Sequence, residues 1–211
     1  MPRVLITSGP TRQYVDPVRY LTNASSGQMG VALATAAISA GMEVVVVSGP
    51  VHVEYPQEAE LHSVVTTDEM FTTCHGLFDE CDGVIGAAAP CDYKVEKVSD
   101  TKLSKTGDGL LLKLIETPDV IASLGKSKRA NQWAVGFALE THDANFKAIT
   151  KMQKKSCDLM VVNGPDAINS TENSVHILDR NGSTVESIHA AKSEVAEAII
   201  RQIEKRLIQR A

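Results

Sequence analysis

Short stretches rich in valine and isoleucine alternate with amphipathic segments along most of the chain. This pattern is typical of a parallel sheet whose two faces are covered by helices. The expected strands are residues 4–8, 43–48, 61–66, 82–89, 133–137 and 158–163, and the expected helices are residues 26–40, 67–80, 143–156, 193–209 and one that opens at Pro118-Asp119. The pattern predicts an α/β fold of the Rossmann-like, doubly wound kind, with a mostly parallel sheet.

Two segments interrupt this alternation. Residues 93–114 mix lysines with two glycines and end rich in leucine, which fits an extended arm or hairpin better than a buried crossover. Such an arm is a candidate lid or dimer contact. Residues 175–178 and 184–188 flank a turn that contains Asn181-Gly182, a strong hairpin signal. The prediction therefore adds an extended arm and a C-terminal hairpin to the sheet.

Length and composition narrow the class of protein. With 211 residues, 43% of them hydrophobic, the chain can bury one substantial core, and we expect a single domain over residues 1–211. The net charge of -5 provides no general attraction to nucleic-acid phosphates. The apolar start is too short for a signal peptide, and no later run approaches membrane-spanning length. We therefore expect a soluble, cytoplasmic protein with neither a nucleic-acid nor a membrane partner.

The cysteines and histidines do not suggest a metal site. Cys74, Cys81, Cys91 and Cys157 lack the short paired spacing of zinc ribbons and redox motifs. The six histidines are scattered without the i, i+4 spacing of metal ligands on a helix. We therefore expect reduced thiols, no disulfide and no structural zinc.

Ligands of open parallel sheets bind outside the carboxyl ends of the strands, so the loops after the strands form the candidate site. After the first strand, Ser25, Ser26 and Gly27 form a hydroxyl and glycine cluster that opens a helix. Such a cluster presents free backbone N–H groups and the positive end of the helix dipole to an anion such as phosphate. An ordinary N-cap with a tight turn has the same sequence, so the cluster alone leaves both interpretations open.

A dinucleotide site is disfavoured. The Gly-x-Gly-x-x-Gly sequence is missing, and the second strand ends in residues 47–50, Val-Ser-Gly-Pro, rather than in an acidic residue for ribose. An NAD(P)-dependent reductase of the short-chain type stays as an alternative, because Tyr93 and Lys97 match Tyr-x-x-x-Lys. That motif should lie on a helix after a glycine-rich turn, and the sequence meets neither condition.

Five motifs in order resemble the signatures of the phosphopantothenate-cysteine ligase family. They are Gly-x-Thr-Arg (residues 9–12) with Asp-Pro-Val-Arg-Tyr (16–20) and Asn-x-Ser-Ser-Gly-x-Met-Gly (23–30), Ala-Ala-x-x-Asp-Tyr (88–93), Lys-Leu-Ser-Lys (102–105), Thr-Pro-Asp-Val (117–120) and Gly-Phe-Ala-Leu-Glu-Thr (136–141). The resemblance spans nearly the whole chain, and five ordered motifs rarely recur by accident.

The resemblance implies a ligase that joins cysteine to 4'-phosphopantothenate in coenzyme A biosynthesis. In that family a nucleoside triphosphate, usually CTP in bacteria, activates the carboxylate as an acyl-nucleotide with release of pyrophosphate, and the amine of cysteine then displaces the nucleotide. The resemblance also implies CTP or ATP as co-substrate, Mg²⁺ held mainly by the nucleotide phosphates, and a homodimer with the arm as a candidate interface.

Such ligases are often fused behind a flavin-dependent decarboxylase. No such segment is present in this sequence, so flavin is not expected.

The resemblance assigns catalysis to Asn23 and Lys102. The Asn23 amide would donate a hydrogen bond to the acyl carbonyl, and Lys102, with Lys105, would close over the phosphates as charge develops. Without the resemblance, Asn23 would be interpreted as a turn residue and the lysines as part of a solvated loop. The residues implied to bind phosphate are Ser25, Ser26 and Gly27.

Nucleotide contacts follow from the same resemblance. They fall on Gly86, Ala87, Ala88, Asp92, Lys102, Pro118, Asp119, Val120, Ile121, Phe137, Lys151 and Lys155. Asp92 would hold ribose hydroxyls or Mg²⁺, and Phe137 would stack near the base. Ordinary alternatives exist for each type: close helix packing for the small residues, a core position for the aromatic, a solvated turn for the aspartate and a solvated helix face for the lysines.

The chain departs from the family pattern at Pro10, at Pro90-Cys91, at Ser104 and at Gly164. Nothing near Cys91 in the sequence marks an activating base, so we interpret it as a packing residue. These departures keep open a third possibility, a noncatalytic nucleotide-binding module with the same fold. Pyrophosphate release would distinguish that module from a ligase.

Overall fold

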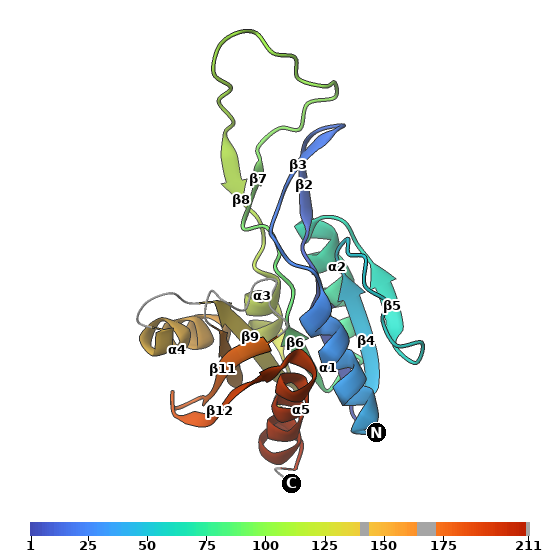
Figure 1. The fold of residues 1–211 in the computed structure, drawn as a ribbon, viewed down its shortest axis with the longest axis vertical. Coiled ribbons are helices and arrows are strands. Elements are labelled where there is room, and N and C mark those ends of the chain that lie inside the picture. Colours follow the sequence, from blue (N-terminus) through green and yellow to red (C-terminus); the bar gives the residue numbers. More distant parts are fainter. Residues whose placement is uncertain (140–143, 164–171, 210–211) are drawn as a thin grey trace.

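The computed structural model describes residues 1–139, 144–163 and 172–209. An eight-stranded sheet forms its centre (Figure 1). The parallel strands are, in spatial order, β10 (Leu159–Asn163), β9 (Trp133–Leu139), β6 (Gly83–Gly86), β1 (Arg3–Ser8), β4 (Glu43–Ser48) and β5 (Glu60–Ser63). Beyond β10, the hairpin of β11 (Glu172–Asp179) and β12 (Thr184–Ala191) extends the sheet in antiparallel fashion. The predicted mostly parallel sheet with a C-terminal hairpin is confirmed.

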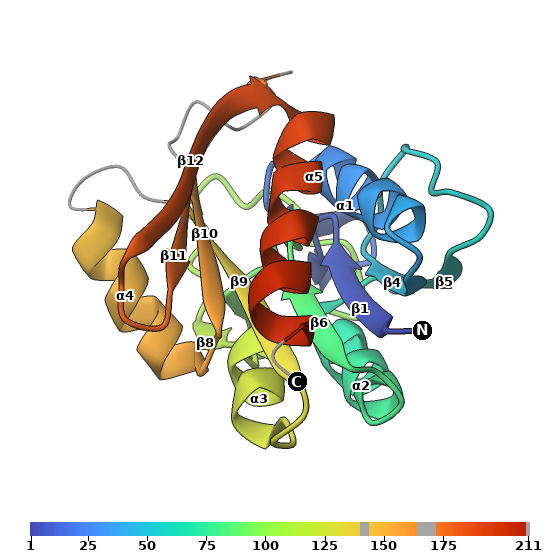
Figure 2. The same cartoon turned by 90° about the horizontal axis from the view of Figure 1, so that it is seen from below.

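Helices cover both faces of the sheet (Figure 2). On one face lie α1 (Gln28–Ser39) and α5 (Lys192–Ile203), and on the other lie α2 (Thr67–Phe78), α3 (Val120–Ser127) and α4 (Ala144–Lys155). Successive β1 side chains point to opposite faces, so Ile6 packs in the core beneath α1 and α5 while Leu5 packs in the core beneath the other three helices. Both side chains are fully buried, which explains why a doubly wound strand is apolar at consecutive positions. None of the described helices is long and apolar enough to span a bilayer.

Helix caps explain where the predicted boundaries were wrong. The strand expected over residues 61–66 ends at Ser63, because Thr66 is the N-cap of α2 in a capping box with Glu69. The helix expected to open at Pro118 begins at Val120, because the side chain of Asp119 is the N-cap and accepts a hydrogen bond from the Ala122 N–H at 3.0 Å.

A hairpin follows β1 where the sequence analysis identified no strands. It consists of β2 (Arg12–Asp16) and β3 (Arg19–Thr22). Its turn is closed by the Asp16 carboxylate, whose Oδ1 accepts hydrogen bonds from the N–H groups of Val18 and Arg19 at 2.9 and 3.0 Å. This aspartate turn is a standard way of reversing the chain without glycine. The hairpin leads directly into Asn23.

The predicted arm is confirmed. Strands β7 (Tyr93–Val95) and β8 (Leu114–Glu116) pair at its base, and residues 96–113 project from the body beside the β2–β3 hairpin (Figure 1). The N–H of Ser99 donates to the Val15 carbonyl at 3.0 Å and joins the arm to that hairpin. Because Tyr93 lies in a strand, the Tyr-x-x-x-Lys match lacks the helix that a short-chain reductase requires.

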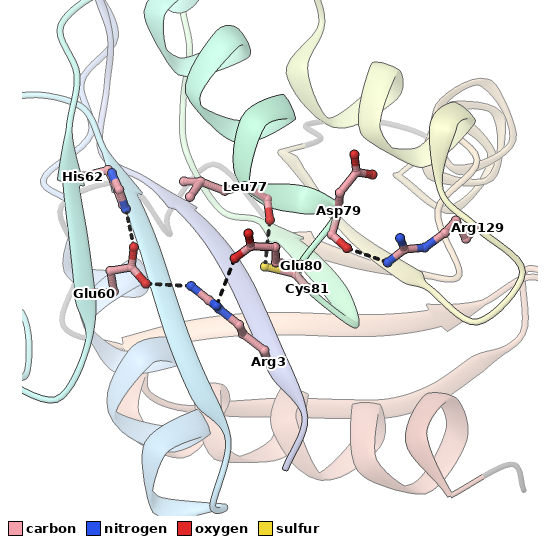
Figure 3. A network of polar contacts seen from close by, with 8 residues as sticks. All are labelled: Arg3, Glu60, His62, Leu77, Asp79, Glu80, Cys81 and Arg129. Atoms are coloured by element: carbon pink, nitrogen blue, oxygen red, sulfur yellow. Dashed lines mark hydrogen bonds and ion pairs between the residues drawn. The ribbon is translucent and has the colours of Figure 1, made fainter.

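A polar network holds together the opposite edge of the sheet, where the parallel strands begin (Figure 3). Arg3, at the start of β1, donates to Glu60 at 2.7 Å and to Glu80 at 3.3 Å, and Glu60 also contacts His62 at 2.8 Å. The hydrogen bond from His62 and the charge of Arg3 hold the pKa of the Glu60 carboxyl below its ordinary value. The network joins β1, β5 and the segment after α2, far from the strand ends where ligands bind, so its role is structural.

The four cysteines are free and buried, in agreement with a packing role. Burial raises the pKa of the Cys74 and Cys157 thiols to about 12 and that of Cys81 to about 11. Burial also raises the pKa of Cys91, so all four are uncharged thiols at neutral pH.

Candidate functional site

A cavity of about 540 Å³ lies at the carboxyl ends of the central strands. One wall is residues 23–30, the loop and first turn of α1; a second is residues 87–90 with Asp92, which follow β6. Phe137 on β9 and two lysines of α4 form a third. Most of the residues implied by the family resemblance therefore meet at one place, although they come from segments more than a hundred residues apart.

The first turn of α1 is shaped for close approach to an anion. Gly27, at its N-cap, has a left-handed φ of 79°, and α1 has no side-chain cap. Gly30 sits against β1 so closely that a Cβ there would lie 1.9 Å from the Ser8 Oγ. The backbone N–H groups of the first turn of α1 and the positive end of its dipole therefore face the cavity, beside Ser25 and Ser26.

Asn23 lines this cavity, but its N–H groups already have partners. Its Nδ2 donates to the carbonyl of Ala89 at 3.2 Å and to that of Pro90 at 2.9 Å. A flipped amide would place Oδ1 against two carbonyl oxygens, so the orientation is well defined. The expected donation to an acyl oxygen thus requires Asn23 to release one of these carbonyls.

The segment after β6 is held rigidly beside the loop. The Ala89 N–H donates to Gly9 O at 2.9 Å, and the Cys91 N–H donates to the Thr11 hydroxyl at 2.8 Å. Ala87 and Ala88 leave room along the cavity wall, and Asp92 contributes a carboxylate. Cys91 itself is only 6% exposed, and its Sγ contacts the carbonyls of Thr11 and Leu21 at the β2–β3 hairpin. It is therefore a packing residue, as the sequence analysis expected.

Two lysines of α4 bring positive charge to the cavity. Lys151 and Lys155 both line it, whereas Lys154 between them does not. The Nζ of Lys155 lies 3.0 Å from an Asp119 carboxylate oxygen, which connects α4 to the start of α3. Half-buried Phe137 lies on the same wall. This part of the cavity suits a negatively charged ligand with an aromatic or sugar group.

Six implied contact residues do not lie in the cavity wall. Apart from Lys102 on the arm, they are Gly86, Pro118, Asp119, Val120 and Ile121. Val120 is in the core, and Ile121 packs so closely against Gly86 that a Cβ there would lie 2.9 Å from the Ile121 Cγ1. Close packing, the ordinary alternative for small and apolar residues, accounts for Gly86, Val120 and Ile121. Asp119 contacts Lys155, which lines the cavity.

Lys102 is exposed on the arm and is not part of the cavity wall. The peptide that follows it is gripped by the hairpin: the Leu103 N–H donates to the Asp16 carboxylate at 3.1 Å, and the Leu103 carbonyl accepts from the Arg19 guanidinium at 2.5 Å. Within one chain, the arm therefore holds Lys102 apart from the other implied site residues.

The sequence analysis did not identify three polar residues that line the cavity. They are Asn163 at the end of β10, Asn173 on β11 and Lys192 at the start of α5. The Lys192 Nζ donates to Asn173 Oδ1 at 3.0 Å, and burial lowers the pKa of Lys192. The Oδ1 of Asn163 is buried and has no hydrogen-bond partner among the described residues. The predicted C-terminal hairpin was the available signal, because β11 pairs with β10 and brings residues of both strands to the same edge of the cavity.

A second cavity, of about 440 Å³, also lies against the loop that contains Asn23. Residues 23–26 line both cavities. The remaining wall comes from the hairpin, with Arg12 and Tyr20, and from residues 50–53 after β4. The Asn23 loop therefore borders two neighbouring cavities.

Comparison with known proteins finds matches over nearly the whole chain. The family model of the DNA/pantothenate metabolism flavoprotein C-terminal domain matches residues 1–207. The coenzyme A biosynthesis bifunctional protein CoaBC of Haemophilus influenzae is 35% identical over 206 residues, which are 96% of this chain and 51% of that protein. A protein named cysteine/cysteine sulfinic acid decarboxylase, from an unknown prokaryotic organism, is 39% identical over 95% of this chain and 57% of its own length.

Solved structures agree with this assignment. The crystal structure of the C-terminal domain of a CoaBC protein superposes with a TM-score of 0.83 at 34% identity and covers 98% of this chain and 96% of that one. The chain thus spans about half the length of the curated relatives it matches, and that half corresponds to a C-terminal domain.

Proposed function

The chain belongs to the family of DNA/pantothenate metabolism flavoprotein C-terminal domains, and from this premise we propose that it is a phosphopantothenate-cysteine ligase of coenzyme A biosynthesis. The observation that carries the proposal is the first cavity, where the uncapped first turn of α1, Asn23 and two lysines converge. This arrangement suits activation of an acid by a nucleoside triphosphate, because it offers phosphate-binding groups beside an amide side chain.

The proposed reaction has two steps. A carboxylate oxygen of 4'-phosphopantothenate attacks the α-phosphorus of CTP, a bond to phosphorus forms and pyrophosphate leaves. The amine of cysteine then attacks the acyl carbon, CMP leaves with the electron pair of the broken C–O bond, and the amine loses one proton. We favour CTP over ATP as the nucleotide.

The described residues take distinct parts in this reaction. Ser25, Ser26 and the Gly27 amide bind phosphate, and Lys151 and Lys155 neutralise charge on the leaving pyrophosphate. The base and ribose lie along Ala87, Ala88 and Phe137. The first turn of α1 favours an anion through its backbone N–H groups, which are neutral dipoles and so add no formal charge to the site.

Mg²⁺ fits this site only as a partner of the nucleotide. Asp92 is the one carboxylate in the wall of the described cavity, and no cluster of three acidic, histidine or cysteine side chains occurs in the described part of the chain. Mg²⁺ usually binds through one or two carboxylates, several waters and substrate phosphates. It would neutralise phosphate charge, with Asp92 as a protein contact.

Asn23 acts in the second step. When the acyl-nucleotide binds, the longer of its two hydrogen bonds, the 3.2 Å contact with Ala89 O, is released and that N–H turns to the acyl oxygen. The carbonyl of Pro90, at 2.9 Å, keeps the side chain in place. Asn23 thereby stabilises negative charge on the acyl oxygen without adding a charge to the site.

A homodimer completes the proposal. The arm exposes a run of large apolar side chains, with Leu110 63% and Leu111 96% exposed and Leu112, Leu114 and Ile115 also exposed. Such a run costs free energy in water, and a second copy of the chain would cover it. Lys102, on the same arm, would reach the phosphates when the arm is ordered in the dimer.

A two-stage assay tests the ligase. Pyrophosphate should appear only when phosphopantothenate, Mg²⁺ and CTP are all present, and CMP should follow on addition of cysteine. Nucleotide binding without either product would instead support a noncatalytic module. Substrate-dependent oxidation or reduction of a nicotinamide, followed by its absorbance, would support the reductase.

A further inference from the structure

One wall of the first cavity has no part in the proposed binding of the nucleotide. This C-terminal wall consists of Asn163 at the end of β10, Asn173 on β11 and Lys192 at the start of α5. The nucleotide is assigned to the other walls, which come from the loop before α1, the segment after β6, Phe137 and α4. The C-terminal wall is therefore available to a different substrate of the proposed reaction.

Lys192 brings a positive charge to this wall in a defined position. Its Nζ donates to the Oδ1 of Asn173 at 3.0 Å, and Asn173 is itself only 3% exposed, so the sheet orients the lysine. Helix α5, which lies beside α1 (Figure 2), begins at Lys192, and its N-cap Ala191 provides no side-chain cap. The N–H groups of its first turn add to the positive potential. This part of the wall favours an anion.

A buried hydrogen-bond acceptor lies on the same wall. The Oδ1 of Asn163 has no hydrogen-bond partner among the described residues. A buried acceptor without a donor costs free energy, so a ligand that brings an N–H group would be favoured here. A phosphate dianion carries no hydrogen for this oxygen and would be repelled by it.

A cation and an acceptor without a donor match the two polar groups of an α-amino acid. The carboxylate of the amino acid suits the lysine, and an amino N–H suits the amide oxygen. The amino group has N–H bonds in both its charged and its neutral form, so the second contact persists when it loses a proton before attack. 4'-Phosphopantothenate contains no amino group. Cysteine is the substrate of the proposed reaction that has both groups.

We propose that the C-terminal wall is the cysteine subsite, where Lys192 binds the carboxylate and Asn163 accepts a hydrogen bond from the amino group. Asn173 is a positioning residue, because it acts through Lys192. Asn23 lines the same cavity, so the attacking amine and the acyl carbon meet without leaving it. This inference rests on the proposed function, because it takes cysteine from it.

The first test removes the positive charge and, separately, the carboxylate. Lys192→Gln should raise the KM for cysteine by about tenfold to a hundredfold, the range for loss of a charge-assisted hydrogen bond, and leave the KM for CTP within about twofold. Lys192→Arg keeps the charge and should fall between Gln and the unchanged protein. With cysteamine, which lacks the carboxylate, kcat/KM should be equal for the Gln variant and the unchanged protein. Lys205→Gln, at an exposed lysine near the C-terminus, is the matched control.

The second test concerns the amino group. Asn163→Leu removes the acceptor at similar side-chain size and should raise the KM for cysteine about tenfold. 3-Mercaptopropionate, which has the thiol and the carboxylate but no amine, should inhibit this variant and the unchanged protein with equal Ki. Its Ki should increase in Lys192→Gln. Equal changes in this Ki for both variants would show that the two residues do not read separate groups of cysteine.

Two kinetic outcomes would overturn the inference. An increased KM for CTP or phosphopantothenate with an unchanged KM for cysteine would assign Lys192 to one of those substrates. An equal loss with cysteine and with cysteamine would show that Lys192 does not recognise the carboxylate and affects the fold of the wall instead.

Pyrophosphate release without cysteine separates this inference from the proposed function. If Lys192→Gln releases pyrophosphate at the unchanged rate and its KM for cysteine is also unchanged, the inference alone fails. If no protein releases pyrophosphate, the proposed function fails, and direct binding of L-cysteine, followed by ligand-observed NMR, still tests the subsite. The unchanged protein should bind cysteine at least about tenfold more tightly than Lys192→Gln. Equal binding, or no binding to the unchanged protein, would contradict the inference.

Discussion

The Asp16 carboxylate accepts a hydrogen bond from the backbone N–H of Leu103 at 3.1 Å, across 87 positions of sequence. The same carboxylate is fully buried and closes the turn that leads to Asn23, and its neighbour Arg19 donates to the Leu103 carbonyl. Both polar groups of the Leu103 peptide are therefore held by the hairpin. The hairpin that leads to Asn23 therefore also holds the peptide that follows Lys102, and these are the two residues that the family resemblance implies for catalysis.

Replacement of Asp16 by Asn should loosen the arm. Asn lacks the negative charge that pairs with Arg19, and only one of its side-chain atoms accepts hydrogen bonds. Trypsin should then cut after Lys102 and Lys105 roughly tenfold faster, the size of effect that follows loss of a charge-assisted hydrogen bond. Asp108→Asn, an exposed carboxylate on the same arm, is the control and should leave the cutting rate unchanged. Equal rates for all three proteins would show that Asp16 does not hold the arm.

The Asp16 contact should be insensitive to pH in the neutral range. Burial alone would raise the pKa of this carboxyl, but the N–H groups of Val18 and Leu103 and the Arg19 side chain outweigh it and lower the pKa from 3.8 to about 2. Because the folded-state pKa is depressed, the stabilisation is complete above about 3.8 and is lost as the pH falls through about 2. The hydrogen-exchange protection factor of the Leu103 amide should therefore be equal at about pH 5 and about pH 8. A decrease at the lower of these pH values would mean that the carboxyl titrates in its ordinary range.

The packing of α1 on β1 can be tested at Gly30. A Cβ there would lie 1.9 Å from Ser8 Oγ and 2.4 Å from Ser8 Cβ, so Gly30→Ala must push the first turn of α1 away from the sheet. We expect the free energy of unfolding in urea to decrease by about 1–3 kcal/mol, with weaker nucleotide binding. Gly76→Ala in α2, where a Cβ meets nothing within 4 Å, should instead increase stability by about 0.5–1 kcal/mol. A loss at Gly76 as large as that at Gly30 would point to a general intolerance of the helices to alanine.

Neighbouring lysines of α4 provide a matched pair for nucleotide binding. Lys151 lines the first cavity and Lys154 does not, although both are exposed on the same helix. Lys151→Ala should lower the affinity for CTP about fivefold, because one cation near the phosphates is removed, and Lys154→Ala should change it by less than about twofold. Thermal shifts with CTP, ATP, GTP and UTP would measure both effects, and CTP should stabilise the unchanged protein most. Equal losses for the two variants would indicate a diffuse electrostatic effect.

The central sheet could be predicted from sequence because its signal is local. Within residues 43–48, four consecutive positions (44–47) are valine, a run that a strand covered on both faces requires, and β4 has the bounds 43–48. The hairpin of residues 12–22 was missed because its strands are short and mix polar with apolar residues. It is stabilised by contacts such as Tyr14 with Tyr20 and Asp16 with Leu103, the second of which joins distant parts of the chain.

The wall of the first cavity could be predicted only in part, for a related reason. The resemblance identified Asn23, Phe137 and Lys151, which do line the first cavity. It gave no indication of Asn173 and Lys192, whose place depends on how the C-terminal hairpin and α5 pack onto β10. Expected contacts such as Gly86 lie instead in helix packing. Motifs identify residue types near a site, but only the packed sheet decides which side chains face the cavity.

The most direct test of the account separates the two chemical steps in an Asn23→Ala variant. Pyrophosphate and CMP are counted in a single turnover, first with phosphopantothenate, Mg²⁺ and CTP and then after addition of cysteine. The account predicts that the variant keeps pyrophosphate release within a few-fold and slows CMP release by about a hundredfold or more, as when one oxyanion donor is removed. CMP release at the unchanged rate would contradict it, because Asn23 would then have no part in acyl transfer.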